Sequence, residues 1–364
     1  MKKYIISSVL ILGSSCGFAK TIYTGDRIDG VPVITHLDVN DLAAGKKYRF
    51  MFKGSEMNIG QSWYTPVIVV KGNNSGKNLL INTGIHGDEL NGAFALQKVM
   101  KSLSPDKVSG AVVGVFQASP NSLMHISRNW YMATDSGEYE NMNRIFPGKQ
   151  NGNTAQVQAY KLWNDLWKGN AQYVIDLHTQ STDTNYPLMV YADYRVPSAQ
   201  QMAELIPADQ IKKDPGEKGS VETTFIEAGI PAITVEIGKG REYQPEYVGR
   251  TVTGINNIMI SLGIIKGSIT QTAKTQGAFI GNDMTSVRAS TGGYAEVLVS
   301  VGDNVKKDQL IAIQSNPFGD LIKEYKSPVD GKVLSTGSGA TREAGGLLVR
   351  ILQQNPDVKC NNGC

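Results

Sequence analysis

The sequence is poor in cysteine and in net charge. Its 364 residues include three cysteines, too few for a disulfide-rich scaffold or a cysteine-based zinc module. The formal net charge is +3, which is not the basic excess that attracts nucleic acid or an anionic membrane surface. We therefore expect no nucleic-acid partner. With a hydrophobic content of 41%, the chain is long enough to bury the cores of about two domains.

Long hydrophobic runs are also missing, so the sequence predicts no transmembrane segment. Residues 4–12 form an apolar run of about ten residues, whereas a helix that spans a bilayer needs roughly 20. Lys2 and Lys3 precede this run, and the tripeptide Gly-Phe-Ala at 17–19 follows it as a small-x-small cleavage motif. We predict a signal peptide over 1–19 and a periplasmic or secreted mature protein.

The cysteines lie at the two ends of the chain. Cys16 permits the alternative of lipoprotein processing, although Gly13 stands where a lipoprotein signal has leucine. Cys360 and Cys364 belong to the tail, 353–364, and are compatible with a small disulfide ring in an oxidising compartment. A metal site in this tail would need more ligands nearby.

Between residues 62 and 263, short β-rich runs alternate with stretches of helical periodicity. The runs are rich in Val and Ile and are bounded mostly by Gly, Pro or Asn, as strands are. We predict strands at 66–70, 78–82, 111–117, 173–177, 188–191 and 232–237, and helices at 89–103, 154–167, 198–205, 221–228 and 245–262. This alternation predicts an α/β domain with a largely parallel sheet and helices on both faces. In such sheets, ligands bind beyond the C-terminal ends of the strands.

The rest of the chain differs from this pattern. Residues 20–61 predict an N-terminal β element. Residues 119–150 show little periodicity, which is typical of a functional or a disordered loop. Residues 264–352 contain short strands and Gly-rich turns without a convincing helix, and they predict a small all-β domain. This domain resembles a biotinyl or lipoyl carrier domain, but the stretch 316–320, where the carrier lysine would stand, contains no lysine.

Four histidines occur, and two of them follow predicted strands. His86 comes after the strand at 78–82, with Glu89 three residues later, and His178 follows the strand at 173–177. Two imidazoles and a carboxylate suit zinc, and a catalytic zinc keeps a fourth position for water. We therefore predict a metal site formed by these three side chains at one edge of the sheet.

Alternative roles and other polar residues near this site have weaker support. A capping or core role is the alternative for His178. Asp176, two residues earlier, is expected to point to the opposite face of its strand. His36 and His125 have no partner at a recognisable spacing.

Two arginines and a glutamate could complete an active site. Arg128 and the pair Asn143-Arg144 lie in the segment 119–150. An arginine near a metal can bind a substrate carboxylate through two hydrogen bonds or stabilise an oxyanion, and the alternative is a solvated surface arginine. Glu236 stands late in the apolar strand at 232–237, where a carboxylate is costly without a partner. If Glu236 reaches the cavity, it is the candidate general base.

These residues, in this order, resemble the succinylglutamate desuccinylase/aspartoacylase family of zinc carboxypeptidase-like hydrolases. The matching motifs are His86-x-x-Glu89, Arg128, Asn143-Arg144 followed by Ile-Phe-Pro-Gly, Asp-Leu-His178 and Val-Glu236-Ile-Gly. The resemblance extends over 62–352, because the family commonly ends in a small β domain. It implies a zinc carboxypeptidase-like fold, a mixed and largely parallel sheet flanked by helices, with a C-terminal all-β domain of barrel-sandwich type.

The resemblance also implies one Zn²⁺ per chain and a role for each motif residue. The implied roles are zinc binding for His86, Glu89 and His178, assistance to the scissile carbonyl for Arg128, binding of the substrate carboxylate for Asn143 and Arg144, and activation of water with proton transfer for Glu236.

The sequence departs from the family pattern at two places and in its predicted export. Asn141-Met142 stands where the family usually has Asp-Leu, and Ser119-Pro120 where it has Asn-Pro. The amino-acid-catabolic members work in the cytoplasm, whereas a periplasmic member meets other substrates, among them murein peptides and secreted N-acyl compounds. These departures leave the substrate open.

We expect an exported zinc-dependent amidohydrolase that cleaves an amide bond next to a free carboxylate, with a small N-acyl amino acid or a peptide as its substrate. One alternative is a periplasmic metallocarboxypeptidase that uses the same residues on cell-wall (murein) peptides. Another, from a different class, is a non-catalytic zinc-binding or ligand-binding protein whose β domain is an interaction module.

Overall fold

The computed structural model describes residues 20–133 and 137–356. The predicted signal peptide, 1–19, and the predicted cysteine pair, Cys360 and Cys364, lie outside the described residues. Within the described part of the chain, no helix is both long enough and apolar enough to cross a membrane.

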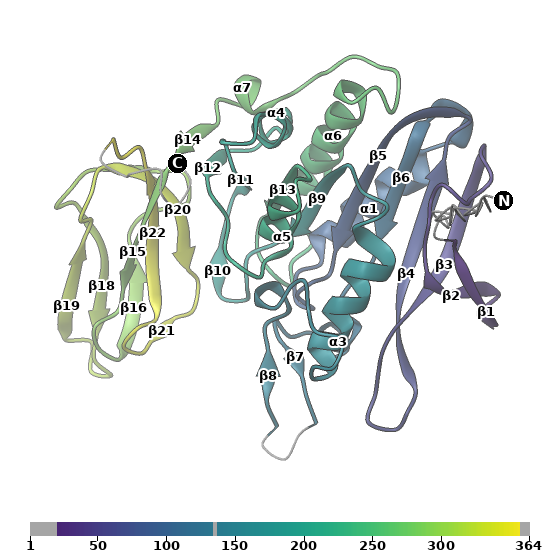
Figure 1. The fold of residues 1–364 in the computed structure, drawn as a ribbon. Helices are drawn as coiled ribbons and strands as arrows, with labels where there is room; N and C mark the ends of the chain where they lie inside the picture. Colours follow the sequence, from purple (N-terminus) through teal and green to yellow (C-terminus); the bar gives the residue numbers. More distant parts are fainter. Residues whose placement is uncertain (1–19, 134–136, 357–364) are drawn as a thin grey trace, which may run out of the picture.

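An eleven-stranded mixed sheet crosses the larger part of the molecule (Figure 1). Its strands are β1 (Ile22–Ile28), β2 (Val31–His36), β3 (Lys46–Glu56), β4 (Ser62–Lys71), β5 (Asn74–Thr83), β6 (Ser109–Val115), β9 (Tyr173–His178), β11 (Leu188–Ala192), β12 (Gln210–Lys213), β13 (Ala232–Ile237) and β14 (Phe279–Gly281). They lie in the order β1-β2-β3-β4-β6-β5-β9-β13-β11-β12-β14. The central strands β6, β5, β9 and β13 run parallel, so their C-terminal ends share one edge.

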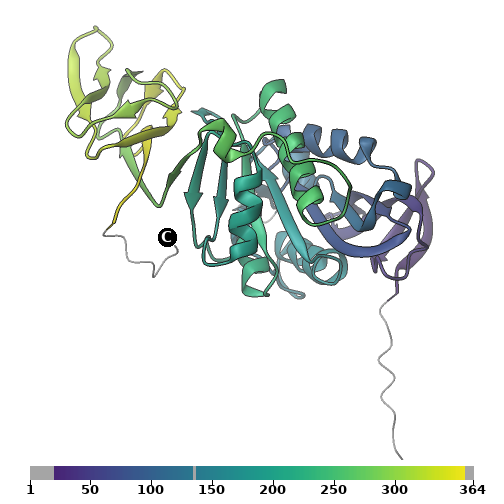
Figure 2. The same ribbon diagram turned by 90° about the horizontal axis from the view of Figure 1, so that it is seen from above.

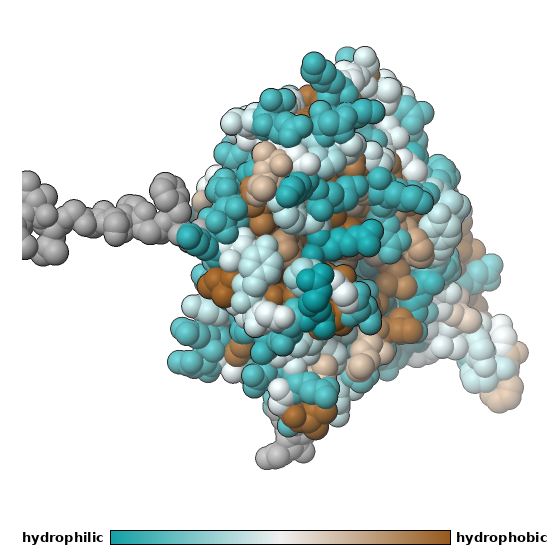
Figure 3. Space-filling view, turned by 90° about the vertical axis from the view of Figure 1, so that its right-hand side faces the viewer, coloured by the Kyte–Doolittle hydropathy of each residue, from teal (hydrophilic) through white to brown (hydrophobic). Residues whose placement is uncertain are grey.

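The N-terminal strands extend this sheet and do not form a separate layer. β3 pairs antiparallel with β4, and β2 and β1 continue the sheet outward. The right-hand side of the molecule in Figure 1, where these strands lie, is mainly hydrophilic, with hydrophobic residues in small separate patches (Figure 3). Ile22 and Tyr23 of β1 are among the exposed hydrophobic residues.

Helices cover both faces of the sheet (Figure 1 and Figure 2). One face carries α1 (Asn91–Ser102), α4 (Pro197–Leu205) and α6 (Pro245–Ser261), and the other carries α3 (Thr154–Lys161), the π-helical turn η3 (Leu162–Trp167) and α5 (Val221–Glu227). Short helical turns are η1 (Pro105–Lys107) and α7 (Ala273–Gln276). The predicted helices are all present, but α1 begins at Asn91, two residues after the predicted start at Glu89, whose side chain turns to the neighbouring histidines.

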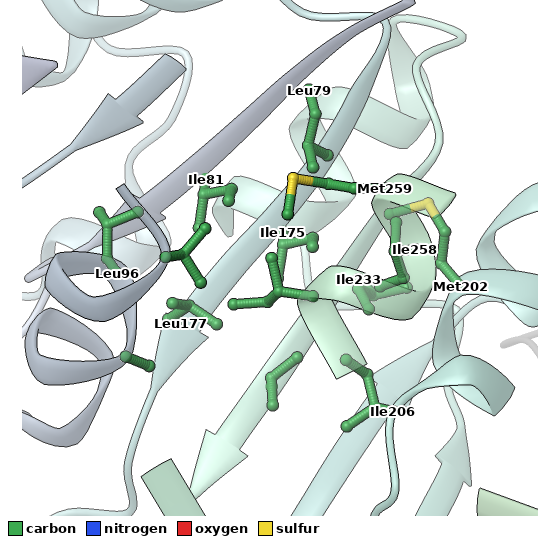
Figure 4. Close-up of a cluster of buried hydrophobic side chains, with 14 of the residues drawn as sticks. Leu79, Ile81, Leu96, Ile175, Leu177, Met202, Ile206, Ile233, Ile258 and Met259 are labelled. Carbon is green, nitrogen blue, oxygen red and sulfur yellow. The ribbon is translucent and has the colours of Figure 1, made fainter. Parts of the chain in front are cut away.

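Two hydrophobic cores fix the central strands between these helices. In β9, Ile175 and Leu177 face the core formed with α1, α4 and α6, which Figure 4 shows, whereas Val174 faces the core formed with α3, η3 and α5. Full burial of one such side chain stabilises the fold by roughly 1.5–3 kcal/mol. Because the strand is buried on both faces, its C-terminal end is held in a fixed place.

The segment predicted as a loop, 119–150, contains short regular elements. They are α2 (Pro120–Met124), the two-stranded hairpin of β7 (Trp130–Tyr131) and β8 (Tyr139–Glu140), and the 3₁₀ turn η2 (Met142–Arg144). Trp130 is fully buried, and its ring packs edge-on against Trp63 of β4. These elements are too short to show a periodicity in the sequence.

From Asp283 onward, the C-terminal strands form two small packed sheets. The predicted small domain begins at 264, but α7 and β14 in that range pack with the large domain. The C-terminal strands are β15 (Asp283–Arg288), β16 (Gly293–Val297), β17 (Asn304–Val305), β18 (Leu310–Ser315), β19 (Leu321–Lys326), β20 (Gly331–Gly337), β21 (Thr341–Arg342) and β22 (Leu347–Gln353). One sheet has the order β19-β18-β16-β21. The other has the order β10-β20-β22-β15, in which β10 (Thr184–Asn185) comes from the large domain. The large domain thus donates an edge strand to the small one.

Candidate metal centre

Three buried side chains meet at the C-terminal edge of the parallel strands. His86 and Glu89 lie in the loop after β5, and His178 is the last residue of β9. Their possible ligand atoms all lie within 4.8 Å of one another. The Glu89 carboxylate lies between the two imidazoles, with 2.8 Å from Oε1 to His86 Nδ1 and 2.8 Å from Oε2 to His178 Nδ1. The structure therefore brings the three predicted ligands together.

The loop that carries His86 is held by its glycine and its aspartate. A Cβ atom at Gly87 would lie 2.0 Å from the carbonyl carbon of Ser122, so only glycine fits there. The buried Asp88 carboxylate accepts a hydrogen bond of 2.9 Å from the hydroxyl of Thr182, in the loop that follows β9. The Asp88 carbonyl accepts another from the Arg241 amide, in the loop that follows β13. The loops after three strands are thereby fixed to one another.

Each histidine is oriented through its second ring nitrogen. The Oδ1 atom of Asn141 accepts a hydrogen bond from the amide of Asn143, so it can only accept from His86 Nε2, which lies 3.0 Å away. His86 therefore carries its proton on Nε2, and the lone pair of Nδ1 faces Glu89. His178 Nε2 lies 2.7 Å from Asp176 Oδ2, and its Nδ1 faces Glu89 in the same way.

The prediction for Asp176 was wrong. This side chain was expected on the opposite face of β9 from His178, but the two are in hydrogen-bond contact. Side chains alternate between the faces of a strand, so residues two apart share one face. Asp176 is fully buried and accepts a second hydrogen bond, 2.7 Å long, from Asn82 of β5.

Burial and neighbouring charges shift the pKa values of the cluster in opposite directions. Burial favours the neutral form of Glu89, but His86 and His178 outweigh it and hold the pKa of Glu89 far below its usual range. Burial also opposes a charge on His178, yet the Asp176 and Glu89 carboxylates raise the pKa of His178 well above its usual value. For His86, burial prevails and lowers its pKa. The cluster therefore combines a permanent carboxylate with one imidazole that favours the neutral form.

This donor set fits a divalent metal ion. Two Nδ1 atoms and two carboxylate oxygens point at one another across 2.8 Å, an arrangement that a cation stabilises. Two imidazoles and one carboxylate are a ligand set of catalytic zinc sites, which leave a position for water. A hydrogen-bond acceptor on the second nitrogen of each ligating histidine is the usual support of such a site. His86, Glu89 and His178 are thus the residues that would hold the ion.

Glu236 lies next to this cluster, on the neighbouring strand. It is the register partner of His178 across β13 and β9. Its side chain is buried, and its Oε2 atom finds no hydrogen-bond partner among the described residues. Burial and the negative charge of Glu89 raise the pKa of Glu236 to about 8. A carboxylate with a raised pKa beside a metal-type cluster is suited to proton transfer.

Arg128 also reaches the cluster. Its Nη1 atom donates to Glu89 Oε1 at 2.9 Å and lies 3.2 Å from His86 Nδ1. The same atom donates to the hydroxyl of Ser181 at 3.0 Å. Ser181 thereby holds the arginine in place, although no motif in the sequence indicated it. The guanidinium is partly exposed, so it can donate to a bound molecule.

Asn143 and Arg144 follow Asn141, whose side chain contacts His86, but their own side chains make other contacts. Asn143 Oδ1 accepts a hydrogen bond of 2.9 Å from the amide of Val221, at the start of α5. Arg144 forms an ion pair of 2.6 Å with Glu217 and is partly exposed. The two other histidines lie elsewhere, with His36 3.5 Å from Asp165 and His125 against the ring of Tyr131.

Comparisons with known proteins give a consistent match. The sequence signature described as "Succinylglutamate desuccinylase/Aspartoacylase catalytic domain" matches residues 75–262. A relative from Halomonas elongata, named N-alpha-acetyl-L-2,4-diaminobutyric acid deacetylase, is 26% identical over 303 residues, which cover 79% of this chain and 85% of that protein.

Solved structures show the same fold. The product-bound ectoine utilization protein EutE (DoeB) from Ruegeria pomeroyi superposes with a TM-score of 0.75 and 20% identity, over 86% of this chain and 97% of that one. A protein from Rhodobacter sphaeroides, described as succinylglutamatedesuccinylase/aspartoacylase, superposes with a TM-score of 0.75 and 20% identity, over 88% of this chain and 98% of that one. The likeness extends over 86–88% of this chain, so it includes at least part of the C-terminal domain.

Proposed function

Because this chain belongs to the succinylglutamate desuccinylase/aspartoacylase family of amide-bond deacylases, we propose that it is an exported, zinc-dependent deacylase of N-acyl amino acids with a free carboxylate. The family and the zinc carboxypeptidase-like fold predicted from the sequence are both confirmed. The observation that carries the proposal is the buried cluster of His86, Glu89 and His178 with Glu236 beside it, whose Oε2 atom has no partner among the described residues.

The proposed mechanism assigns the chemistry to a few side chains. When bound, a zinc ion supplies Lewis acidity, which polarises the scissile carbonyl and lowers the pKa of the attacking water. Glu236 accepts the proton of that water and delivers it to the nitrogen of the leaving amine. Arg128, held by Ser181, donates hydrogen bonds to the oxygen that becomes negatively charged.

The substrate class rests on the relative and on the arginines. The relative from Halomonas elongata bears the name of a deacetylase of an N-acetylated amino acid, which supports a small N-acyl amino acid here. We propose that Asn143 and Arg144 bind the carboxylate next to the scissile amide, for which Arg144 would have to exchange its ion pair with the exposed Glu217. Export is proposed from the sequence over 1–19.

The direct test is a comparison of substrates under metal control. Purified protein, stripped with a chelator and reloaded with zinc, is incubated with N-acyl amino acids and, separately, with muropeptides, and the products are identified by mass spectrometry. Zinc-dependent release of free amino acids supports the proposal. Cleavage confined to muropeptides would replace the substrate by cell-wall peptides. Zinc binding without hydrolysis of either set would contradict an enzymatic function.

Substitution of Glu236 separates catalysis from metal binding. Glu236→Gln keeps the size of the side chain but cannot accept a proton, so we expect kcat to fall by roughly 10²–10⁴-fold. Zinc content measured by elemental analysis should stay at one ion per chain. Glu343→Gln, at an exposed position of the small domain, is the matched control and should be fully active. An active Glu236→Gln variant would remove Glu236 from the mechanism.

A further inference from the structure

The small domain contacts the large domain one strand away from Glu236. Leu334 of β20 and Leu352 of β22 pack against Tyr186 and Met189 of the large domain in a buried hydrophobic cluster. Met189, on β11, is the register partner of Glu236 on β13. The contact between the domains therefore borders the candidate active site.

Arg350 of the small domain points into this contact. It lies two residues before Leu352 on β22, so the two side chains share the face that is turned toward the large domain. Its Nε atom donates to the hydroxyl of Ser286 on β15 at 3.2 Å, and its charge acts on Tyr186, whose side chain belongs to the same contact. Tyr186 in turn lies 2.8 Å, oxygen to oxygen, from the hydroxyl of Tyr191.

The charge of Arg350 is left without a paired carboxylate among the described residues. The hydrogen-bond partner of its side chain is the neutral hydroxyl of Ser286, and the acid whose charge acts on it is Glu236. Burial raises the pKa of Tyr186 to about 12, so its hydroxyl stays protonated beside the arginine. A guanidinium has five N–H donors, and hydroxyl partners leave donors free for an anion. Arg144, in contrast, is already paired with Glu217.

We propose that Arg350, together with the hydroxyl of Tyr186, binds a carboxylate of the substrate that is remote from the scissile amide. His178, Glu236 and Met189 lie on three adjacent strands, so the contact at Met189 begins about 10 Å from the end of β9, at roughly 4.8 Å per strand. That distance suits the far end of a small N-acyl amino acid. The small domain thus determines the substrate specificity of the large one. The inference rests on the proposed function.

The first test compares charged substrates with neutral ones of the same shape. Wild type, Arg350→Gln and Arg350→Lys are assayed with N-acetylglutamate and N-acetylglutamine, and with N-succinylalanine and N-butyrylalanine. For at least one pair, Arg350→Gln should raise KM for the charged member at least tenfold and leave KM for the neutral member unchanged. The KM of Arg350→Lys for the charged member should lie between those of wild type and Arg350→Gln. Equal losses on all four substrates would show a structural role and overturn the subsite.

The second test does not depend on turnover. Succinate binding to zinc-free protein is measured by calorimetry, so that the metal cannot bind the probe. Arg350→Gln should weaken binding at least tenfold, whereas Arg288→Gln, on the neighbouring strand β15, should bind as wild type does. Equal affinity of wild type and Arg350→Gln, or no binding to either, overturns the subsite. If no N-acyl substrate is hydrolysed but succinate binding still depends on Arg350, the proposed function fails and the anion subsite stands.

Discussion

The two candidate histidine ligands differ in the group that orients them. His178 Nε2 faces the carboxylate of Asp176, whereas His86 Nε2 faces the neutral amide oxygen of Asn141. A carboxylate polarises an imidazole more strongly than an amide does and makes its free nitrogen a better electron donor. His86 is therefore the weaker donor of the pair, and Asn141 stands where the resembling family usually has aspartate.

Asn141 is thus expected to limit the metal affinity of this chain. Asn141→Asp should tighten zinc binding by roughly tenfold, and Asn141→Ala, which leaves His86 Nε2 without an acceptor, should weaken it by roughly 10–100-fold. Competition with a chromogenic chelator measures both affinities without any assay of activity. The exposed Asn164→Asp is the control for the added charge and should leave the affinity unchanged. Identical zinc affinity in all variants would contradict a role for Asn141.

At this scale the sequence predicts the ligands better than the residues that support them. His86, Glu89 and His178 are polar residues at the ends of apolar strands, which is a strong local signal. Asp176 has the same signal and was misplaced by an error in strand parity. No local sequence signal marks Arg350, because it belongs to a different domain and lies more than a hundred residues after Glu236 in the chain. Contacts of this kind depend on domain packing, which no local pattern encodes.

Helix α5 carries a buried acid that contacts β13, the strand on which Glu236 lies. Glu222 is buried, its Oε2 atom forms a hydrogen bond of 2.7 Å with the hydroxyl of Thr234 on β13, and its Oε1 atom has no partner among the described residues. Burial raises the pKa of Glu222 well above its usual value, and nearby carboxylates such as Asp176 and Asp214 act in the same direction. The folded protein therefore favours the protonated, neutral form of Glu222.

Replacement of Glu222 should change how stability depends on pH. A raised pKa in the folded state gives stability that is complete below the unfolded pKa, about 4.3, and is lost as the pH rises toward the folded pKa. Glu222→Gln cannot ionise, so its melting temperature relative to wild type should rise between pH 4 and pH 8. At pH 8 we expect the free energy of unfolding of Glu222→Gln, relative to wild type, to be higher than at pH 4 by about 1 kcal/mol or more.

A control on the same helix makes this result specific. Glu227 is exposed, so Glu227→Gln should follow the wild-type stability at every pH. Thermal unfolding followed by circular dichroism across the pH range gives the comparison. A difference in melting temperature between Glu222→Gln and wild type that does not change with pH would show that the pKa of Glu222 is not raised in the folded protein.

Strands that are buried on both faces were the easiest elements to predict. β9 and β13 are mainly apolar because each contacts two cores. The hairpin of β7 and β8 could not be predicted, since each of its strands has two residues and its support is the buried Trp130. Its position is set by tertiary packing, and the same is true of β10, which pairs with a strand of the other domain.

The two domains of the molecule are joined through several independent contacts. β10 of the large domain pairs with β20, and Gln210 Nε2 on β12 donates to the Val333 carbonyl at 3.0 Å. The hydrophobic cluster around Leu334 and Met189 lies between these contacts. The loop that leads from His178 into β10 carries Ser181, so the strand pairing also supports the residue that holds Arg128.

We therefore expect the two domains to unfold as one cooperative unit. The four tryptophans all lie in the large domain, so their fluorescence reports its unfolding alone, whereas calorimetry reports both domains. The fluorescence midpoint should coincide with a single calorimetric peak. A carboxylate at position 334 costs several kcal/mol at this buried hydrophobic contact, so Leu334→Asp should split the calorimetric peak in two. The partly exposed Leu298→Asp, in the same domain, should keep a single peak. Two peaks in the wild type would mean that the domains are only loosely joined, and Arg350 would then lack the fixed position that its subsite requires.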